Sequence, residues 1–381
     1  MLPPSPAAAG ASPDRTAPTE RIRAFVVDDS SVVRAFVKKA LEAAPDVTVV
    51  GTAEDGARAI RKLDGLDVDV VVLDVEMPIL DGLSALPDIL KAPARPPKVV
   101  MASTLTRRGA SISIQALVKG AADYVPKPTS LGADGAEEFS RVLLASVRAW
   151  GAKVRQERER ASARRPAQAA ATATAAAPPR KPSLLAHVRR PEALAVGCST
   201  GGPQALLRLF ANLRGQRLGP VFVTQHMPPT FTTLFADQLG RISGRPCHEA
   251  VDGETVLDGN IYLAPGDWHM VAEGQPGAVR LRRLQTPPEN WCRPSVDPMF
   301  RALAKIYGDR LLALVLTGMG QDGCAGARLV AEKGGTVLAQ DEASSVVWGM
   351  PGAVTQAGIA REALDLDALA GRVGQLFGSP A

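Results

Sequence analysis

The sequence is short of the features that mark membrane proteins and secreted, disulfide-rich proteins. No apolar run reaches roughly 18 residues, so we expect no transmembrane helix and no insertion into a membrane. Residues 1–20 are small and proline-rich, lack the apolar stretch of a signal peptide, and predict a disordered tail. The four cysteines are widely spaced without a CxxC pair, which argues against a disulfide framework and a structural zinc site. These absences favour a reducing, cytoplasmic setting.

Excess charge is confined to one stretch of the chain. The 381 residues carry 44 Lys or Arg against 39 Asp or Glu, a net charge of +5 with a pI near 9.1, which alone suggests a nucleic-acid or membrane partner. Residues 151–190 contain ten basic and two acidic residues, a net +8, so the rest of the chain carries −3. The basic balance therefore does not point to a nucleic-acid partner. The length predicts two or three domains.

Short apolar runs alternate with helix-like stretches over residues 21–145. The expected strands cover residues 22–27, 47–53, 68–73, 98–102 and 123–125. The expected helices between them cover residues 31–44, 57–63, 85–91 and 110–119. Strands that alternate with helices form a parallel sheet with right-handed crossovers, so this region predicts one doubly wound α/β domain.

A change of composition separates this region from the rest. Residues 167–177 hold eight alanines in eleven positions, prolines flank them, and large apolar side chains are scarce, so no core can form there. We predict a flexible linker over residues 146–190. Because alanine favours helices, it stays open whether the last helix of the first domain runs into the linker.

A second alternation predicts another doubly wound parallel-sheet domain over residues 191–381. Its expected strands cover residues 193–196, 221–224, 261–264 and 311–317. Its expected helices cover residues 204–213, 230–240, 296–307, 323–333 and 364–377. Residues 271–284 predict a small antiparallel hairpin with its turn at 274–277. The expected fold class is therefore α/β, with two doubly wound domains joined by a flexible linker.

Polar side chains follow the predicted strands of the first domain. Asp28 and Asp29 follow the first strand and Asp74 follows the third, at ends that line the ligand crevice of an open parallel sheet. Three converging carboxylates call for a cation, most simply Mg2+. Ser103 and Lys127 follow the next two strands and suit the oxygens of a phosphoryl group. Each aspartate taken alone has an alternative interpretation as a loop or helix-cap residue.

The first domain resembles the response-regulator receiver family over residues 21–144. The segments that carry the resemblance are VVDDS, LDVEMPILDG, MAST and VPKP. The resemblance implies that Asp74 accepts a phosphoryl group from a sensor histidine kinase. It also implies that Asp28 and Asp29 help to hold Mg2+. Ser103 and Lys127 would then contact the phosphoryl oxygens.

The second domain places a serine, a histidine and an aspartate after three predicted strands. Ser199 lies in GCSTGG (197–202), a nucleophile-elbow pattern whose glycines permit a sharp turn between a strand and a helix. His226 and Asp322 follow two further strands. A serine nucleophile needs a neighbouring base, and the base needs an orienting carboxylate, so the three predict an acyl-transfer site. Their chain order disfavours the α/β-hydrolase fold, in which the aspartate precedes the histidine.

Simpler interpretations remain for these segments. A glycine-rich turn between a strand and a helix also binds phosphate, or nothing. Cys198 precedes the proposed nucleophile, and a neighbour at a sharp turn points elsewhere. His187 falls in the linker, and His248 and His269 fall in expected loops, so we expect solvated or structural roles for these three histidines.

The second domain resembles the catalytic domain of the chemotaxis protein-glutamate methylesterases, the CheB family, over residues 191–377. The segments that carry the resemblance are VGCSTGGPQAL, QHMPPTFT, LTGMGQDG and SSVVWGMPGAV. It implies Ser199 as the nucleophile, His226 as the base and Asp322 as the orienting acid. An oxyanion contact from the backbone N–H of Met319, with the Thr200 region nearby, is implied as well. No cofactor is expected for ester hydrolysis.

Joined to a receiver, this resemblance implies a phosphorylation-activated serine hydrolase of sensory adaptation. The expected substrates are glutamate methyl esters and certain glutamines of methyl-accepting chemotaxis receptors, which give glutamate with methanol or ammonia. The expected partners are those receptors and the kinase. The unphosphorylated receiver is expected to pack over the catalytic face. The alternatives are a DNA-binding response regulator, which needs a basic recognition helix, and a catalytically silent docking module.

Overall fold

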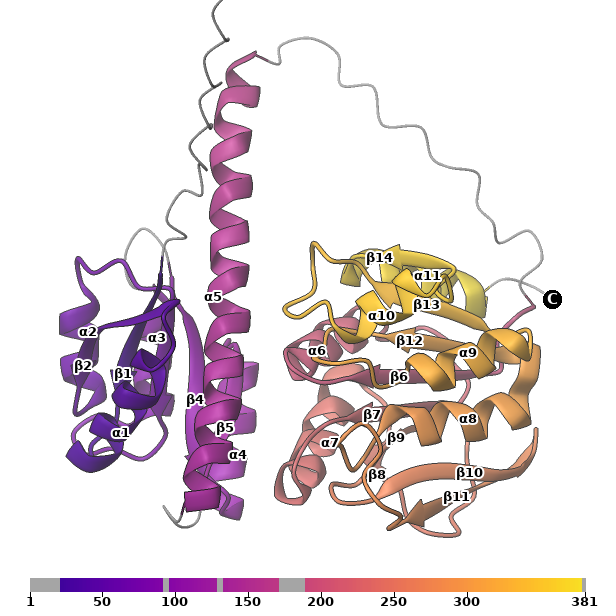
Figure 1. Ribbon diagram of the computed structural model, residues 1–381. Helices are drawn as coiled ribbons and strands as arrows, with labels where there is room; N and C mark the ends of the chain where they lie inside the picture. The colour runs from indigo at the N-terminus through magenta and orange to yellow at the C-terminus, as the bar shows by residue number, and fades with distance from the viewer. Residues whose placement is uncertain (1–20, 92–95, 129–132, 171–188, 379–381) are drawn as a thin grey trace, which may run out of the picture.

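The structure, a computed structural model, describes residues 21–91, 96–128, 133–170 and 189–378, which form two α/β domains (Figure 1). The tail expected over residues 1–20, the linker residues 171–188 and His187 lie outside the described residues. In the described ranges, no helix is both long enough and apolar enough to cross a bilayer.

The first domain contains a five-stranded parallel sheet in the order β2-β1-β3-β4-β5, within the described residues. Its strands are β1 (Ile22–Val27), β2 (Val47–Ala53), β3 (Val70–Asp74), β4 (Lys98–Thr104) and β5 (Asp123–Lys127). Its helices are α1 (Ser31–Glu42), α2 (Gly56–Leu63), α3 (Gly82–Lys91), α4 (Arg107–Val118) and α5 (Ala133–Ala170). This strand order brings the carboxyl ends of β1 and β3 to a common crevice, as the sequence predicted.

Helices cover both faces of this sheet, so its central strands are buried and rich in valine. Helices α1 and α5 pack on one face, and α2, α3 and α4 pack on the other. Three helices begin at side-chain caps, in which Ser30, Asp55 and Thr106 accept hydrogen bonds from backbone N–H groups. The local sequence thus fixes where these helices start.

Helix α5 is 38 residues long and continues to Ala170. The domain boundary predicted at residue 146 therefore lies inside a helix, and the helix does run into the predicted linker. Two observations explain this extension. Residues 151–161 are mostly good helix formers without proline, and the side chains of Trp150 and Val154 are buried.

The second domain contains a seven-stranded parallel sheet in the order β14-β13-β12-β6-β7-β9-β8, again within the described residues. Its strands are β6 (Ala193–Cys198), β7 (Val221–Gln225), β8 (Cys247–Glu249), β9 (Ile261–Leu263), β12 (Leu311–Val315), β13 (Thr336–Gln340) and β14 (Glu362–Leu364). Strands β10 (His269–Gln275) and β11 (Ala278–Leu284) form the predicted hairpin. Its turn is shorter than the predicted 274–277, because Gly274 and Gln275 still pair with the opposite strand.

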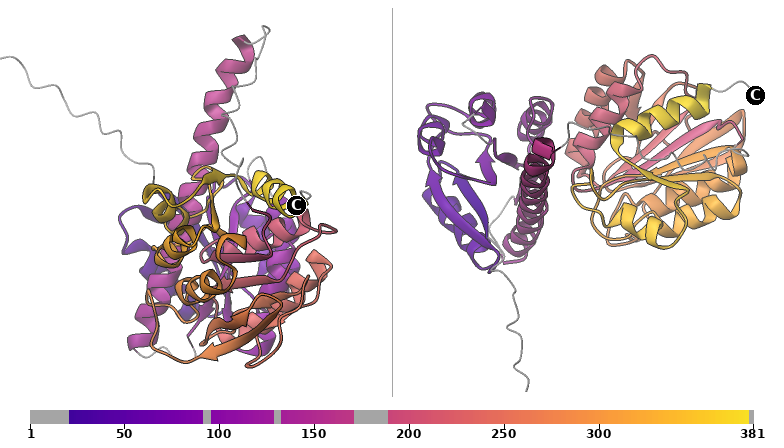
Figure 2. Two further views of the ribbon diagram at one scale, coloured as in Figure 1. Left: turned by 90° about the vertical axis from the view of Figure 1, so that its right-hand side faces the viewer. Right: turned by 90° about the horizontal axis from the view of Figure 1, so that it is seen from above.

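Helices also cover both faces of the second sheet (Figure 2). They are α6 (Gly202–Asn212), α7 (Pro229–Ser243), α8 (Val296–Tyr307), α9 (Cys324–Glu332), α10 (Met350–Gln356) and α11 (Leu366–Gly378), with the 3-10 helix η1 (Gly308–Arg310) before β12. Buried side chains of α6, α7 and α11 form the core on one face, and those of α8, α9 and α10 form it on the other. Both domains therefore have the predicted doubly wound fold.

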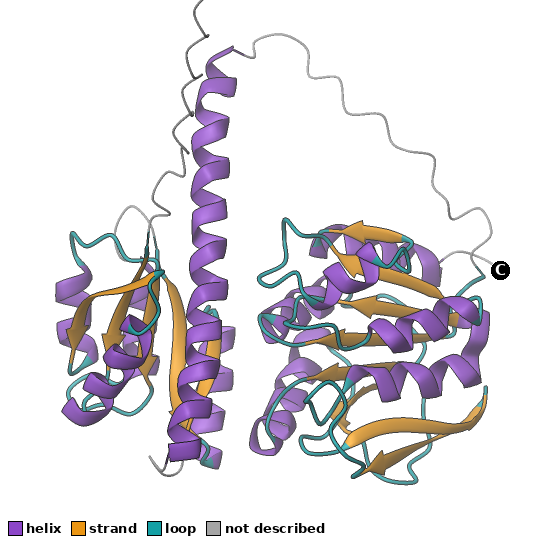
Figure 3. Cartoon of the chain, viewed as in Figure 1, coloured by secondary structure: helices purple, strands orange, loops and turns teal. Residues whose placement is uncertain are grey.

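The receiver-like domain contacts the second domain through α4, β5 and α5. The Tyr124 ring stacks on the Phe231 ring of α7, with 4.4 Å between the ring centroids. Gln204 of α6 donates a hydrogen bond of 2.6 Å to the carbonyl of Leu117 at the end of α4. Lys153 of α5 donates to the carbonyl of Ala343, in the loop after β13. The carboxyl ends of the second sheet thus face the first domain (Figure 3).

Candidate functional site

Four predicted residues of the first domain meet at the ends of β1, β3 and β5. Carboxylate oxygens of Asp28, Asp29 and Asp74 lie within 4.8 Å of one another. The Nζ atom of Lys127 lies 2.7 Å from Oδ2 of Asp28 and 2.7 Å from Oδ1 of Asp74. Burial raises the pKa of the Asp74 carboxyl to about 6, although the Lys127 ammonium lowers it. The arrangement gathers three carboxylates and one ammonium at a partly buried crevice.

This donor set fits a hard divalent cation such as Mg2+, which prefers carboxylate and water oxygens. Asp28 and Asp74 are buried, whereas Asp29 is exposed, so the cluster is open to solvent on one side. Among the predicted residues, Ser103 makes no hydrogen bond to these carboxylates in the described part of the chain. Its fully buried hydroxyl instead accepts a hydrogen bond of 2.7 Å from Ser113 of α4.

Ser199 lies at the turn between β6 and α6. Its backbone N–H donates to the Thr317 carbonyl at 3.0 Å. Gly201 starts α6 in the left-handed region with a φ of 75°, which a residue with a Cβ rarely adopts. A Cβ on Gly318 would come within 2.9 Å of the Ser199 Cβ, so the loop after β12 lies directly against the serine. Sequence and packing together fix Ser199 at the carboxyl end of the central strand.

Strand register brings the three predicted residues to adjacent strand ends. Strand β6 pairs with β7 so that Cys198 is opposite Gln225, which places Ser199 and His226 one residue beyond the paired positions. Strand β12 pairs with β6 on its other side and leads into the loop that carries Asp322. The nucleophile elbow therefore lies between the strand that presents the histidine and the one that presents the aspartate.

His226 and Asp322 are joined by a hydrogen bond of 2.7 Å between Nε2 and Oδ2. The Asp322 carboxylate is buried and accepts further hydrogen bonds. Its other donors are the Ser295 hydroxyl, the Asn290 amide and the backbone N–H groups of Val296, Asp297 and Gly323. Burial raises the pKa of Asp322, but the bonds from His226 and these donors outweigh it and hold that pKa below its ordinary value. Asp322 is therefore a fixed, ionised partner for the imidazole.

Because Asp322 occupies Nε2, the nitrogen of His226 that is free for proton transfer is Nδ1. It lies 3.3 Å from the Sγ of Cys292. Burial lowers the pKa of His226, but hydrogen bonds to Asp322 and Cys292 raise it to about 9. Within the described residues, the Ser199 hydroxyl makes no hydrogen bond. In this state the imidazole is paired with a thiol and protonated at neutral pH.

Two backbone N–H groups beside the serine are free. Those of Thr200 and Met319 donate no hydrogen bond to any group in the described part of the chain. The neighbouring N–H of Gly318, by contrast, donates to the Val347 carbonyl at 3.0 Å. Free donors next to a serine nucleophile suit the negative oxygen of a tetrahedral intermediate.

The remaining candidates have structural partners. The Cys198 thiol is buried, which raises its pKa far above the ordinary value, and it donates to the Gln225 side chain at 3.1 Å. His248 bonds Glu254 at 2.8 Å. His269 is buried between the Pro287 carbonyl and the Ser295 backbone N–H. None of these three needs a catalytic role to explain its surroundings.

Comparison with known proteins gives the family. The CheB methylesterase family model matches residues 194–373, and the response regulator receiver domain model matches residues 24–133. A protein-glutamate methylesterase/protein-glutamine glutaminase of Azospirillum brasilense is 47% identical over 96% of this chain and 94% of its own length. The chain belongs to the CheB methylesterase family. It contains a receiver domain and a methylesterase domain.

Two further known proteins are similar to this chain. A protein-glutamate methylesterase/protein-glutamine glutaminase of group 2 operon from Rhodospirillum centenum is 46% identical over 91% of this chain and 92% of its own length. The solved structure of the Thermotoga maritima CheB methylesterase catalytic domain is 38% identical, covers 49% of this chain and 98% of that chain, and aligns with a TM-score of 0.47.

The candidate site includes residues that strand-end reasoning missed. Asn290, Cys292 and Ser295 come from the segment between β11 and α8. The sequence could have indicated Ser295, because a serine directly before a predicted helix is an N-cap candidate. In the structure it takes the N-cap position of α8 without a capping bond and gives its hydroxyl to Asp322 instead. Nothing in the local sequence marked Asn290 or Cys292.

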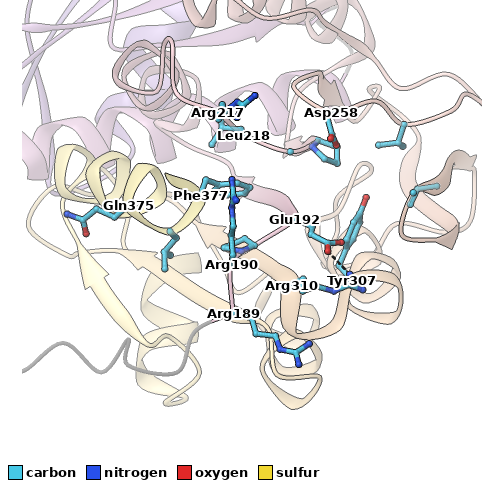
Figure 4. Close-up of a pocket in the computed structure, with 17 residues that line it drawn as sticks. Arg189, Arg190, Glu192, Arg217, Leu218, Asp258, Tyr307, Arg310, Gln375 and Phe377 are labelled. Carbon is cyan, nitrogen blue, oxygen red and sulfur yellow. Dashed lines mark hydrogen bonds and ion pairs between the residues drawn. The ribbon is translucent and has the colours of Figure 1, made fainter. Parts of the chain in front are cut away.

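A large cavity of about 1260 Å³ lies away from this site (Figure 4). It is lined at the amino ends of β6 and β7, where Glu192 pairs with Arg310 and where Arg190 and Arg217 are exposed. It shares no lining residue with the Ser199, His226 and Asp322 group. This cavity therefore lies at the opposite end of the sheet from the candidate site.

Proposed function

We propose that this chain is a phosphorylation-activated protein-glutamate methylesterase that also deamidates glutamines. Its substrates are glutamate methyl esters and certain glutamines of methyl-accepting chemotaxis receptors. The observation that carries the proposal is the hydrogen-bonded His226–Asp322 pair at strand ends beside the elbow of Ser199. A compact basic output domain, which the DNA-binding alternative requires, is not what the described residues of the second domain form.

The reaction is acyl transfer through the serine. The Ser199 Oγ attacks the γ-carbonyl of the ester, and Nδ1 of His226 takes the hydroxyl proton. The N–H groups of Thr200 and Met319 stabilise the negative oxygen that forms. When the carbonyl reforms, the C–O bond to the methoxy group breaks, and His226 returns the proton to give methanol.

Hydrolysis of the acyl-enzyme completes the cycle. Water attacks the Ser199 ester, gives a proton to His226, and the serine leaves with that proton while glutamate is released. On a glutamine the same steps release ammonia. Both half-reactions need a neutral imidazole, so the Cys292 contact at Nδ1 must be exchanged for the serine hydroxyl before the attack. The described arrangement is therefore a resting one.

The receiver controls the activity of the methylesterase domain. We infer that Asp74 accepts a phosphoryl group from a histidine kinase, with Lys127 beside it as a counter-charge. Asp28, Asp29 and Asp74 would hold Mg2+, which supplies positive charge to the phosphoryl oxygens when it is bound. Ser103 accepts a hydrogen bond from Ser113 of α4, and its own hydroxyl hydrogen is left to donate to those oxygens.

The hydrogen bond between Ser113 and Ser103 connects the phosphorylation site with the domain contact. Ser113 lies on α4, the helix that packs on α7 of the catalytic domain, and Tyr124 stacks on Phe231 beside it. Phosphorylation can raise activity only if the modified receiver favours an undocked arrangement over the docked one. We therefore propose that donation from Ser103 to the phosphoryl group shifts α4 through the Ser103–Ser113 bond, weakens this docking and opens the catalytic face to receptors.

The kinase, the receptors and the cytoplasmic location belong to this proposal. A cytoplasmic location is supported by the four free cysteines, which stay reduced in that compartment. The direct test is to measure methanol released from methylated receptors, with and without a phosphodonor. We expect the Asp74→Asn variant to keep basal release and lose the gain. A gain that persists in that variant would contradict the control mechanism.

A further inference from the structure

Trp291 is a fully exposed aromatic side chain next to the triad. Its relative exposure is 100%, although an exposed indole leaves a large apolar surface in water. Its two chain neighbours both touch the triad. The Asn290 amide donates to Oδ1 of Asp322 at 2.9 Å, and the Cys292 Sγ lies 3.3 Å from Nδ1 of His226. Trp291 is thus held at the rim of the catalytic site.

The backbone that carries Trp291 is strained. Residues 289–292 form a tight turn closed by two backbone hydrogen bonds between Glu289 and Cys292, of 3.0 and 3.2 Å. Asn290 and Trp291 both have positive φ, at 52° and 63°. Turns of this kind favour Asn followed by Gly, and a bulky residue in the second position is unfavourable. Such strain persists where the surroundings fix it, and it gathers at functional positions.

Contacts on the inner side of the turn hold it in place. The Asn290 amide also donates to Asp297 at 2.9 Å, and Glu289 forms an ion pair of 2.7 Å with Arg301 of α8. The turn is therefore anchored at its first two residues and at Cys292. Only the Trp291 side chain is left pointing away from these anchors into solvent.

A second apolar side chain is exposed at the nucleophile. Met319 is 45% exposed and follows Gly318, which lies against the Ser199 Cβ. The docked receiver does not cover Trp291, because its side chain is fully exposed in the structure that contains both domains. The occupant of this rim is therefore not the receiver.

We propose that Trp291 is a substrate-binding residue that packs against the protein segment carrying the modified glutamate. The inference rests on the proposed function and names part of its recognition surface. A glutamate methyl ester has no charge, so the ester group itself offers no ion pair, and apolar contact around the side chain adds to its recognition. A rigidly held indole beside the base provides that contact at low entropic cost.

The test separates protein recognition from triad chemistry. Full-length wild-type, Trp291→Ala and Trp291→Phe proteins are compared on two probes in the presence of a phosphodonor. One probe is receptor membranes carrying tritiated methyl groups, and the other is p-nitrophenyl acetate, a small ester that needs no docking. Leu257→Ala is the matched control, because Leu257 is also an exposed apolar residue but lies in the loop before β9 at the far end of the sheet.

We expect Trp291→Ala to raise the KM for receptor methyl groups roughly tenfold or more, as loss of an aromatic anchor does. Its kcat and its rate on p-nitrophenyl acetate should stay near wild type, and Trp291→Phe should keep most of the receptor affinity. Equal losses on both probes would overturn the inference, because the turn would then act only by supporting the triad. Unchanged receptor kinetics in Trp291→Ala would overturn it as well. A wild-type protein that releases no methanol would contradict the proposed function itself, which is a distinguishable outcome.

Discussion

The ring of Tyr124 in the receiver lies flat on the ring of Phe231 in the catalytic domain, with 4.4 Å between the centroids and 12° between the planes. Both rings are buried, and they join the hydrophobic cores of the two domains into one cluster. Tyr124 lies on β5, the strand that ends at Lys127, whose ammonium bonds Asp74. The domain contact and the phosphorylation site thus share a strand.

Weakening the contact between the receiver and the catalytic domain should raise the rate of methanol release by the unphosphorylated protein. Gln204 donates to the carbonyls of Leu117 and Ala121, and each lost hydrogen bond is worth about 0.5–1.5 kcal/mol. Gln204→Ala should therefore increase basal methanol release severalfold and reduce the further gain from a phosphodonor. Arg208→Ala is the control, since Arg208 is on the same helix but pairs with Asp367 inside the catalytic domain. Equal effects of the two changes would show that docking is not what limits basal activity.

The dependence of kcat/KM on pH should report the pKa of the His226 imidazole. The base must be neutral, and His226 has a pKa raised to about 9 by Asp322 and Cys292. Below that value kcat/KM should rise roughly tenfold per pH unit. Cys292→Ser removes a sulfur contact that raises the pKa of His226, so the midpoint should move to lower pH. Cys247→Ser, a cysteine on β8, should leave the profile unchanged. A Cys292→Ser midpoint equal to that of wild type would contradict the assigned contact.

The hydrogen bonds around Asp322 should matter for turnover more than for binding. Ser295→Ala removes a 2.7 Å bond to its carboxylate, and a bond to a charged group is worth about 1.5–3 kcal/mol. We expect kcat to fall by roughly one to two orders of magnitude with little change in KM. Ser243→Ala removes a buried hydroxyl that bonds only backbone groups at the end of α7, those of Gly240 and Arg245, and kcat should be unaffected. A change confined to KM in Ser295→Ala would argue against an orienting role.

Removal of divalent cations should abolish activation by a phosphodonor and leave the basal rate of ester hydrolysis unchanged. The carboxylate cluster belongs to the receiver, and the proposed ester chemistry uses Ser199, His226 and Asp322. EDTA should therefore abolish the gain produced by acetyl phosphate and leave basal methanol release intact. Asp29→Asn should need more Mg2+ for the same gain, because Asp29 is the exposed member of the cluster. Activation that survives EDTA would count against a metal-dependent phosphoryl site.

Much of the fold follows from local patterns in the sequence. The predicted strands over 22–27 and 47–53 match β1 and β2 at both ends, and the helix predicted over 296–307 matches α8. These elements have continuous apolar runs or clear amphipathic spacing. The prediction missed β8, β14 and α10, because two are three-residue edge strands and the third begins with Met-Pro-Gly. It also missed β13, a buried strand that follows two glycines.

The residues of the candidate site likewise include some that the sequence could predict and some that it could not. Ser199, His226 and Asp322 could be proposed because each follows a recognisable strand, and parallel strands bring their carboxyl ends together. Cys292 and Trp291 could not, because their place depends on a turn with two positive φ values that tertiary contacts hold. The hydrogen bond of Ser103 to Ser113 likewise depends on how α4 packs on β4. Loop paths and domain contacts are properties of the folded chain.

The central claim is that Ser199 is the nucleophile of a receptor methylesterase. The most direct measurement is the rate of methanol release from methyl-labelled receptor membranes by wild-type and Ser199→Ala proteins, both folded as judged by circular dichroism. The account predicts release by the wild type and a loss of roughly four orders of magnitude or more in the variant, as for other serine triads. Release by Ser199→Ala at a rate near that of wild type would contradict it.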